Sequence, residues 1–211
     1  MKIYSVGYPW GDFLEGYGDY TIVDSPEELN TDEPSFMVLW GGADISPSIY
    51  GHENVMSHPS PNRDKVEVPI TKRAIELGIP ILGICRGAQM LCGVAGGYLV
   101  QHLDNHGSGH DVITPDGFEF RVNSLHHQMM AGLEKVSHEL LAWTKDKRSK
   151  VYLADTTVPE DIKEVEAVYF PEVKGLAIQW HPEMMATDST ASKFVFQNID
   201  KYLIIEDNNH G

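Results

Sequence analysis

Two apolar runs separated by a helix-like segment constrain the fold more than any other feature of this sequence. The runs are FMVLW at 36–40 and IPILGI at 79–84, and the segment VPITKRAIELG at 68–78 lies between them. Strand, helix and strand in this order, with strands that are apolar on both faces, are typical of a parallel sheet buried between helices. The sequence therefore predicts an α/β fold with a parallel sheet.

The second half of the chain changes character. Short β-rich runs recur there with polar turns between them: FEFRVN at 118–123, ELLAWT at 139–144, KVYLAD at 150–155, VEAVYF at 165–170 and GLAIQW at 175–180. We expect additional strands here, several of them antiparallel. The segment 189–204 predicts a terminal helix with Ser189 as its N-cap, and the tail at 206–211 is expected to fray.

Size and charge limit the classes of protein that this chain can represent. A chain of 211 residues, 42% of them hydrophobic, suits one domain, which we take to span 1–211. The net charge of −15, from 16 Lys and Arg against 31 Asp and Glu, repels nucleic acids and anionic membranes. No run approaches the roughly 18 to 20 apolar residues of a membrane span, and the first residues lack the pattern of a signal peptide. We expect a cytoplasmic protein.

A reactive cysteine is predicted at Cys85. It stands between Gly83 and Gly87 directly after an apolar run, which is the strand, turn and helix layout of a nucleophile elbow. Glycine is needed at both positions because a side chain would clash across so tight a turn. The positive end of the following helix and the charge of Arg86 favour the thiolate. From this motif alone a buried structural cysteine is an equal alternative, and that alternative is the better account of Cys92.

The chain also offers partners for a cysteine nucleophile, which needs a base and a group to orient the base. His181 follows an apolar strand, with Glu183 two residues later, at the sheet edge where active sites form. Gly41 and Gly42 follow another strand, where bare backbone N–H groups can approach an oxyanion. Each pair is weak evidence alone, but with the amide of Arg86 they complete a site for acyl transfer.

The sequence resembles the class I glutamine amidotransferase superfamily, and most closely its γ-glutamyl-γ-aminobutyrate hydrolase-like family, peptidase C26. Six motifs carry the resemblance, in the order LWGGADISPSIYG, NRD, PILGICRGAQML, GGYLVQHL, VNSLHHQ and AIQWHPE. They extend from about Val38 to Glu183. The resemblance implies a flavodoxin-like open, mostly parallel sheet with helices on both faces and additional antiparallel strands in the second half.

The resemblance also implies roles for single residues. Cys85 matches the nucleophile, His181 the base and later acid, and Glu183 the orienting group. Gly42 and the amide of Arg86 match the donors of the oxyanion hole. The residues that match the substrate side of the family's site are Gly41, Gln89, Ser124, His126 and His127.

The implied activity is cofactor-free hydrolysis of the γ-glutamyl amide bond of glutamine or a γ-glutamyl amine, through a glutamyl thioester. One alternative is a glutaminase subunit that supplies ammonia to a separate synthetase or ligase. Another is a non-catalytic binding protein on the same scaffold. An α/β-hydrolase with cysteine in place of serine is disfavoured, because its acid would precede the histidine in the chain. The sequence does not indicate an oligomeric state.

The chain departs from the family pattern in three places. Only the segment 7–18 separates the runs KIYSV and YTIVD, where the family has a sizeable helix, so we expect a trimmed sheet edge. Trp40 stands where proline is common, and a longer segment at 155–164 replaces a short turn. These differences surround the expected pocket rim and bear on the leaving group more than on the chemistry.

Two loop segments invite a functional interpretation. The stretch 46–63 is rich in Pro, Ser and His and is too long for an ordinary turn, so it is expected to be a functional loop. In the second segment His102, His106 and His110 recur every fourth residue, as in some metal sites. Two glycines break any helix that could align these histidines, and the spacing therefore does not predict a metal site.

Overall fold

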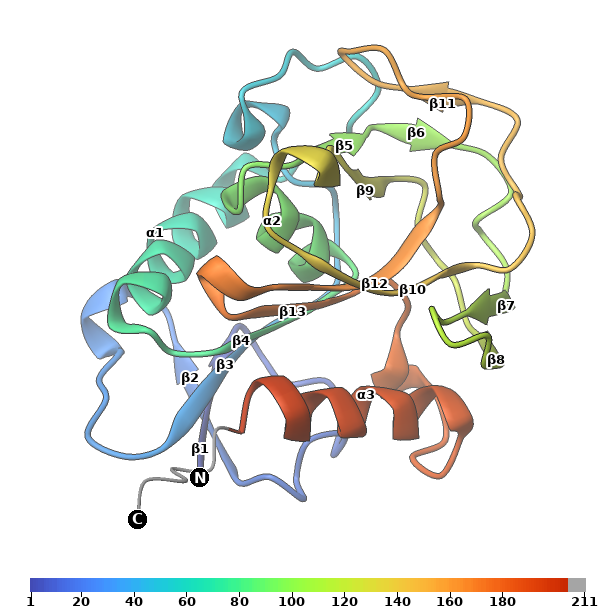
Figure 1. The fold of residues 1–211 in the computed structure, drawn as a ribbon. Coiled ribbons are helices and arrows are strands. Elements are labelled where there is room, and N and C mark those ends of the chain that lie inside the picture. Colours follow the sequence, from blue (N-terminus) through green and yellow to red (C-terminus); the bar gives the residue numbers. More distant parts are fainter. Residues whose placement is uncertain (205–211) are drawn as a thin grey trace.

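A nine-stranded mixed sheet forms the centre of the structure, a computed structural model that describes residues 1–204 (Figure 1). Across the sheet the strands are β2 (Asp19–Val23), β1 (Lys2–Val6), β3 (Ser35–Leu39), β4 (Ile81–Ile84), β13 (Gly175–Ile178), β12 (Val165–Phe170), β10 (Glu139–Thr144), β7 (His110–Ile113) and β8 (Glu119–Val122). Neighbouring strands are parallel from β2 to β13 and antiparallel from β13 to β8. The predicted α/β fold, with a parallel core and antiparallel strands later, is confirmed.

Helices cover both faces of this sheet. Helices α1 (Pro61–Leu77) and α2 (Arg86–Val94) lie on one face, and α3 (Thr190–Tyr202) lies on the other (Figure 1). As predicted, α3 begins after the N-cap Ser189, whose hydroxyl accepts the backbone N–H of Ser192 at 3.1 Å. None of the described helices combines the length and apolar character that a membrane span requires. The tail at 206–211 lies outside the described residues.

The apolar strands of the parallel half bury side chains on both faces. In β3, Phe36 and Val38 pack on the α3 side, whereas Met37 and Leu39 pack on the side of α1 and α2. Successive side chains of a strand point to opposite faces, so a strand between two helical layers buries the side chains of both faces and is apolar throughout. Each fully buried side chain of this size stabilises the fold by about 1.5–3 kcal/mol. Because a one-residue shift of β3 would move all four side chains to the wrong face, their burial fixes the register of the strand.

Helix α1 begins earlier than the sequence pattern indicates. It starts at Pro61, a position where the missing proline N–H costs nothing, so the long loop expected through residue 63 ends before it. The first turns escaped detection because their buried positions are charged. Asp64 and Glu67 are both buried against Arg86, and an apolar pattern cannot reveal such a face.

The connection from β1 to β2 contains no helix between residues 7 and 18, as the short segment predicted. Aromatic packing on α3 holds this connection. The Phe13 ring stacks on Phe196 of α3 with centroids 5.0 Å apart, and the Tyr17 hydroxyl donates to the Phe196 carbonyl at 3.1 Å. Leu14 beside them is fully buried. The sheet therefore ends at β2 as a trimmed edge.

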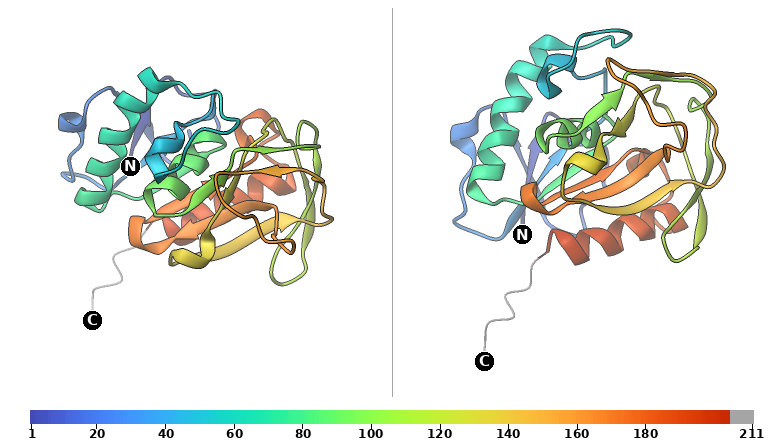
Figure 2. Two further views of the ribbon diagram at one scale, coloured as in Figure 1. Left: turned by 90° about the horizontal axis from the view of Figure 1, so that it is seen from above. Right: turned by 45° about the horizontal axis from the view of Figure 1, so that its top comes forward.

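Two small sheets lie on the α2 side of the main sheet (Figure 2). They pair β5 (Tyr98–Val100) with β9 (Met129–Ala131) and β6 (His102–Leu103) with β11 (Tyr152–Leu153). The sequence predicted a longer strand at 150–155 and none at β5, β6, β7 or β9. These strands are short, and β6 and β7 contain histidines, so tertiary pairing and not local apolar alternation determines them.

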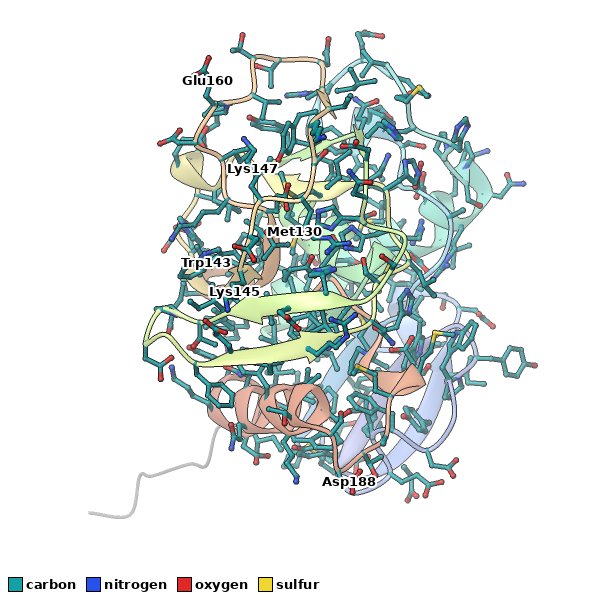
Figure 3. All side chains as sticks on the ribbon, turned by 90° about the vertical axis from the view of Figure 1, so that its right-hand side faces the viewer. Met130, Trp143, Lys145, Lys147, Glu160 and Asp188 are labelled. Atoms are coloured by element: carbon teal, nitrogen blue, oxygen red, sulfur yellow. The ribbon has the colours of Figure 1, made fainter. Side chains whose placement is uncertain are left out.

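The β7–β8 hairpin closes the far end of the sheet, in front of β10 and above α3 (Figure 3). Phe120 of β8 packs against Phe194 of α3 with ring centroids 4.9 Å apart. Lys145, which is labelled beside the hairpin, pairs with Glu119 at 2.7 Å. This end therefore joins the antiparallel strands to the helix that covers the other face.

Candidate active site

Cys85 occupies a strained turn between β4 and α2. Its φ of 51° and ψ of −103° are unusual for a residue with a side chain and cost on the order of 1–3 kcal/mol. Two backbone hydrogen bonds hold the turn, from the Cys85 N–H to the Ile178 carbonyl at 2.7 Å and from the Gln89 N–H to the Cys85 carbonyl at 3.1 Å. This is the strand, turn and helix geometry of a nucleophile elbow.

The two glycines beside Cys85 are required by close packing. A Cβ added at Gly83 would lie 2.5 Å from the Gly87 carbonyl group, across the turn itself. A Cβ added at Gly87 would lie 2.7 Å from the Leu39 Cβ, where α2 packs on β3. Both distances are far below van der Waals contact, so the clash predicted from the sequence is present at both positions.

His181 and Glu183 lie just beyond the end of β13. The His181 Nδ1 is 2.7 Å from the Glu183 Oε1, and both side chains are largely buried. Asn123 holds the backbone of His181 from both sides: its Nδ2 donates to the His181 carbonyl at 2.7 Å, and its Oδ1 accepts the His181 N–H at 2.8 Å. Asn123 belongs to the VNSLHHQ motif, but no residue pattern in the sequence predicts this contact.

The environment of His181 favours its protonated form. Burial disfavours charge on the ring, but the neighbouring Cys85 sulfur and the Glu183 carboxylate outweigh burial and raise the pKa of His181 to about 10. Because this pKa lies above the ordinary value of 6.5, the interaction stabilises the fold fully below about pH 6.5 and is lost as the pH rises through about 10. At neutral pH the sulfur of Cys85 therefore faces an imidazolium.

The glycine pair after β3 lies against both the elbow and the base. A Cβ at Gly41 would lie 2.5 Å from the His181 Cε1 and 3.5 Å from the Cys85 Cβ. Gly42 has a φ of 149°, and a Cβ there would overlap the Arg63 guanidinium and lie 3.7 Å from the Arg86 Cδ. The N–H of Arg86 opens α2, and the first N–H groups of a helix have no partner within it.

Arg63 of α1 fixes the backbone of this glycine pair. Its Nη1 donates to the Gly41 carbonyl at 2.8 Å, and its Nη2 donates to the Trp40 carbonyl at 3.0 Å. The Arg63 Nε donates to Glu67, one turn along the helix, at 2.5 Å. Arg63 belongs to the NRD motif, and the sequence pattern predicted it at the end of a loop with no role for its side chain.

The Arg86 side chain points toward α1. Its guanidinium is fully buried and pairs with Asp64 at 2.5 Å and with Glu67. Burial, together with the charge of Arg63, lowers the pKa of Arg86 to about 10, so the group remains charged at neutral pH. The side chain thus links α2 to α1, while the backbone N–H remains at the elbow.

Three of the expected substrate contacts have polar groups that are engaged inside the protein. The Gln89 amide is 3% exposed and lies 3.5 Å from the Gln179 side-chain oxygen. Ser124 is buried and donates to the His106 carbonyl. His126 is also buried, with its Nδ1 2.8 Å from the Gln128 carbonyl. In this arrangement Ser124 and His126 support the loop and do not present a surface to a substrate.

His127, the remaining candidate from this motif, is different. Its side chain is 39% exposed, and its Nε2 lies 3.1 Å from the Asp44 carboxylate. The hydrogen bond to Asp44 raises the pKa of His127. His127 is therefore the side chain of this loop that can carry a positive charge at an accessible position.

A hollow of about 510 Å³ opens beside the glycine pair. Its lining includes Tyr8, Trp10, Trp40, Gly41, Gly42 and Arg63. Tyr8 and Trp10 come from the short connection after β1 and are exposed. The departures from the family pattern at the first connection and at Trp40 thus lie together on this hollow.

Comparison with known proteins gives the family of the chain. The family model for peptidase C26 matches residues 35–117. A glutamine amidotransferase-like YvdE homolog of Lactococcus lactis subsp. cremoris is 35% identical over 159 residues, covering 61% of this chain and 85% of that protein. Rv2859c of Mycobacterium tuberculosis, a candidate glutamine amidotransferase by name, is 30% identical over 202 residues, covering 86% of this chain. The chain spans only 64% of the length of Rv2859c.

A named hydrolase and a solved structure are also similar. PuuD of Escherichia coli (strain K12), a γ-glutamyl-γ-aminobutyrate hydrolase, is 27% identical over 183 residues, covering 74% of this chain and 66% of PuuD. The fold matches that of Ta0944m from Thermoplasma acidophilum, which is named as a candidate part of a GMP synthase, with a TM-score of 0.64 and 21% identity, covering 96% of this chain and 94% of the other. The chain therefore belongs to the peptidase C26 family and has the class I glutamine amidotransferase-like fold that its motifs indicated.

Proposed function

We propose that the protein hydrolyses the γ-glutamyl amide bond of glutamine or of a γ-glutamyl amine. In this proposal Cys85 is the nucleophile, His181 the base and acid, and Glu183 the group that orients His181. One observation supports it most: the strained Cys85 at the start of a helix faces His181, whose Nδ1 is hydrogen-bonded to the Glu183 carboxylate at 2.7 Å. That bond leaves the His181 Nε2 as the nitrogen that exchanges a proton with the thiol.

The reaction follows from these positions. The Cys85 thiolate attacks the γ-carbonyl carbon, and the carbonyl electron pair moves to oxygen, which the N–H groups of Gly42 and Arg86 stabilise. One such donor is typically worth a factor of about 10²–10³ in kcat. Protonated His181 gives its proton to the leaving nitrogen as the C–N bond breaks. Water, deprotonated by His181, then cleaves the glutamyl thioester and releases glutamate.

The leaving group is expected to lie over the hollow beside the glycine pair. PuuD, a relative of this chain, is named for hydrolysis of γ-glutamyl-γ-aminobutyrate, which supports a small amine as the second product. Exposed Tyr8 and Trp10, from the short connection where the resemblance implied a helix, line the hollow. We infer that the amine preference of this protein differs from that of PuuD, while the glutamyl chemistry is shared.

A glutaminase subunit is the second candidate function. Rv2859c is named as a candidate glutamine amidotransferase and the YvdE homolog as a glutamine amidotransferase-like protein, and these names support transfer of ammonia to a partner. The same triad would serve this function, so the site geometry does not separate the two. A synthetase or ligase that co-purifies stably, and without which glutamine is not hydrolysed, would support the second candidate over the first.

The first prediction concerns the substrate. Purified protein alone is expected to release glutamate from glutamine or from at least one member of a panel of γ-glutamyl amines, measured as free glutamate. Matched α-glutamyl amides serve as controls, because they carry the same groups with the scissile carbonyl in another place. Absence of release from every γ-glutamyl amide would contradict a freestanding hydrolase.

The second prediction separates an enzyme from a binding protein on the same scaffold. Iodoacetamide at neutral pH is expected to alkylate Cys85, which faces an imidazolium, and to leave Cys92 unmodified. Burial raises the pKa of Cys92 to about 12, so its thiolate is negligible there. Peptide mass spectrometry identifies the modified residue, with Cys85→Ala as the control. Equal modification of the two cysteines would favour the non-catalytic alternative.

A further inference from the structure

A cluster of histidines and glutamates is buried close to the candidate active site. His106 lies between β6 and β7, His126 lies in the loop before β9, and Glu166 lies on β12. Their side chains are 1%, 2% and 0% exposed, respectively. The proposed reaction uses none of them. Groups of this kind are costly to bury without partners, so the arrangement calls for a compensating interaction.

The distances within the cluster suit a metal ion. The Glu166 Oε1 lies 3.6 Å from the His106 Nδ1 and 3.5 Å from the His126 Nε2. One ligand atom from each of the three residues can be chosen so that all lie within 4.8 Å of one another. Ligands bonded to Zn²⁺ at about 2.0–2.1 Å in a tetrahedron stand about 3.4 Å apart. The cluster therefore needs little movement to surround one ion.

The hydrogen bonds of the two histidines aim their lone pairs into the cluster. The His126 Nδ1 lies 2.8 Å from the Gln128 carbonyl, an acceptor, so this nitrogen carries the proton of a neutral ring. The His106 Nε2 likewise lies 3.1 Å from the Glu164 Oε2. The other nitrogen of each ring then presents a lone pair to the Glu166 carboxylate. Within residues 1–204, neither of these nitrogens nor the Glu166 Oε2 has a hydrogen-bond partner.

The surrounding groups are those that metal-binding histidines use. Such a histidine usually donates its second N–H to a carboxylate or a backbone carbonyl, as His106 and His126 do here. Glu164 is itself held by the Tyr152 hydroxyl at 2.6 Å. The cluster thus places two glutamate carboxyl groups beside two histidines, all of them buried.

We propose that His106 Nδ1, His126 Nε2 and Glu166 bind a divalent transition metal, with Zn²⁺ as the best fit to this donor set. His110 Nε2 lies 2.8 Å from the Glu166 Oε1 and forms a hydrogen bond with this carboxylate, which holds it in place. The regular histidine spacing in the sequence did not reveal this site, because two of its three main ligands come from segments far along the chain.

The proposed site is structural and positions the active site. Ser124, two residues before His126, donates to the backbone of His106, while the neighbouring Asn123 holds His181. On the other side, the Gln179 N–H donates to the Glu166 carbonyl at 2.8 Å, two residues before His181. A metal that joins His106, His126 and Glu166 therefore fixes the loop and the strand that together place His181.

The test uses the whole protein with Zn²⁺ and Co²⁺ as probes. Elemental analysis of purified protein is expected to find about one Zn²⁺ per chain, and removal by a chelator is expected to lower the Tm. Returning Zn²⁺ at about 1,000 times its Kd should raise the Tm by about 8–16 °C. Co²⁺ should give the intense visible absorption of a tetrahedral site, a readout that requires neither activity nor a variant.

Variants then assign the ligands. His126→Ala and Glu166→Gln are expected to lose the Co²⁺ absorption, whereas His138→Ala, at an exposed histidine outside the cluster, should keep it. If the ligand variants do not fold, the spectrum of the unaltered protein still decides the matter. Protein that contains no metal, binds neither ion and shows no change of Tm would overturn the proposal.

Discussion

Replacement of Cys85 by alanine is expected to abolish the release of glutamate from γ-glutamyl amides, lowering kcat by a factor of about 10⁴ or more. The thioester cannot form without the sulfur, and the oxyanion donors alone cannot replace covalent catalysis. Alanine keeps the Cβ of Cys85 and the strained backbone of the elbow, so the fold should be unchanged. The measurement is steady-state release of glutamate, with circular dichroism to verify folding.

Cys92→Ala is the matched control for this prediction. Cys92 lies in the helix that follows Cys85 and is fully buried, so this substitution removes a thiol that acts only as a small packed side chain. We expect its kcat to stay within a few-fold of the unaltered protein, at a modest cost in stability. Activity that survives Cys85→Ala would show that Cys85 is not the nucleophile.

The parallel half of the fold could be predicted because each of its strands is marked by a continuous apolar stretch of sequence. The strands β3, β4 and β13 lie between two helical layers, and their continuous apolar sequences record that burial directly. The start of α1 could not be predicted in this way, because Asp64 and Glu67 occupy its buried face. Likewise, β6 and β7 contain histidines where an apolar residue would have signalled a strand.

In the candidate site, too, the local motifs could be predicted from the sequence and the long-range contacts could not. The elbow, the base and the glycine pair are short motifs at strand ends, so residues adjacent in sequence carry the pattern. Arg63 and Asn123 act on backbone groups of Gly41 and His181, which lie 22 and 58 residues away. No local pattern records such contacts. The His106, His126 and Glu166 cluster is a further case, since it exists only after three segments meet.

Arg86→Met is expected to lower the free energy of unfolding by about 3–5 kcal/mol, the usual cost of removing one partner from a buried ion pair. The guanidinium of Arg86 is fully buried between Asp64 and Glu67. Without it, the Asp64 carboxylate loses its cationic partner, while Glu67 keeps Arg63. Urea denaturation measures the change, provided that the slope of the unfolding free energy against urea concentration is the same in the variant and the unaltered protein.

The same variant separates the two contributions of Arg86. Its backbone N–H remains at the start of α2, so kcat at low temperature, measured per folded molecule, should fall by less than about tenfold if the N–H and not the charge stabilises the oxyanion. Arg73→Met is the matched control, because Arg73 pairs with Glu76 at 3.1 Å on the surface of the same helix that holds Asp64. An exposed pair of this kind is worth about 0–1 kcal/mol. Equal costs for the two variants would mean that the buried ion pair between α1 and α2 does not stabilise the fold. A loss of kcat as large as that of Cys85→Ala would instead assign the Arg86 side chain a direct part in catalysis.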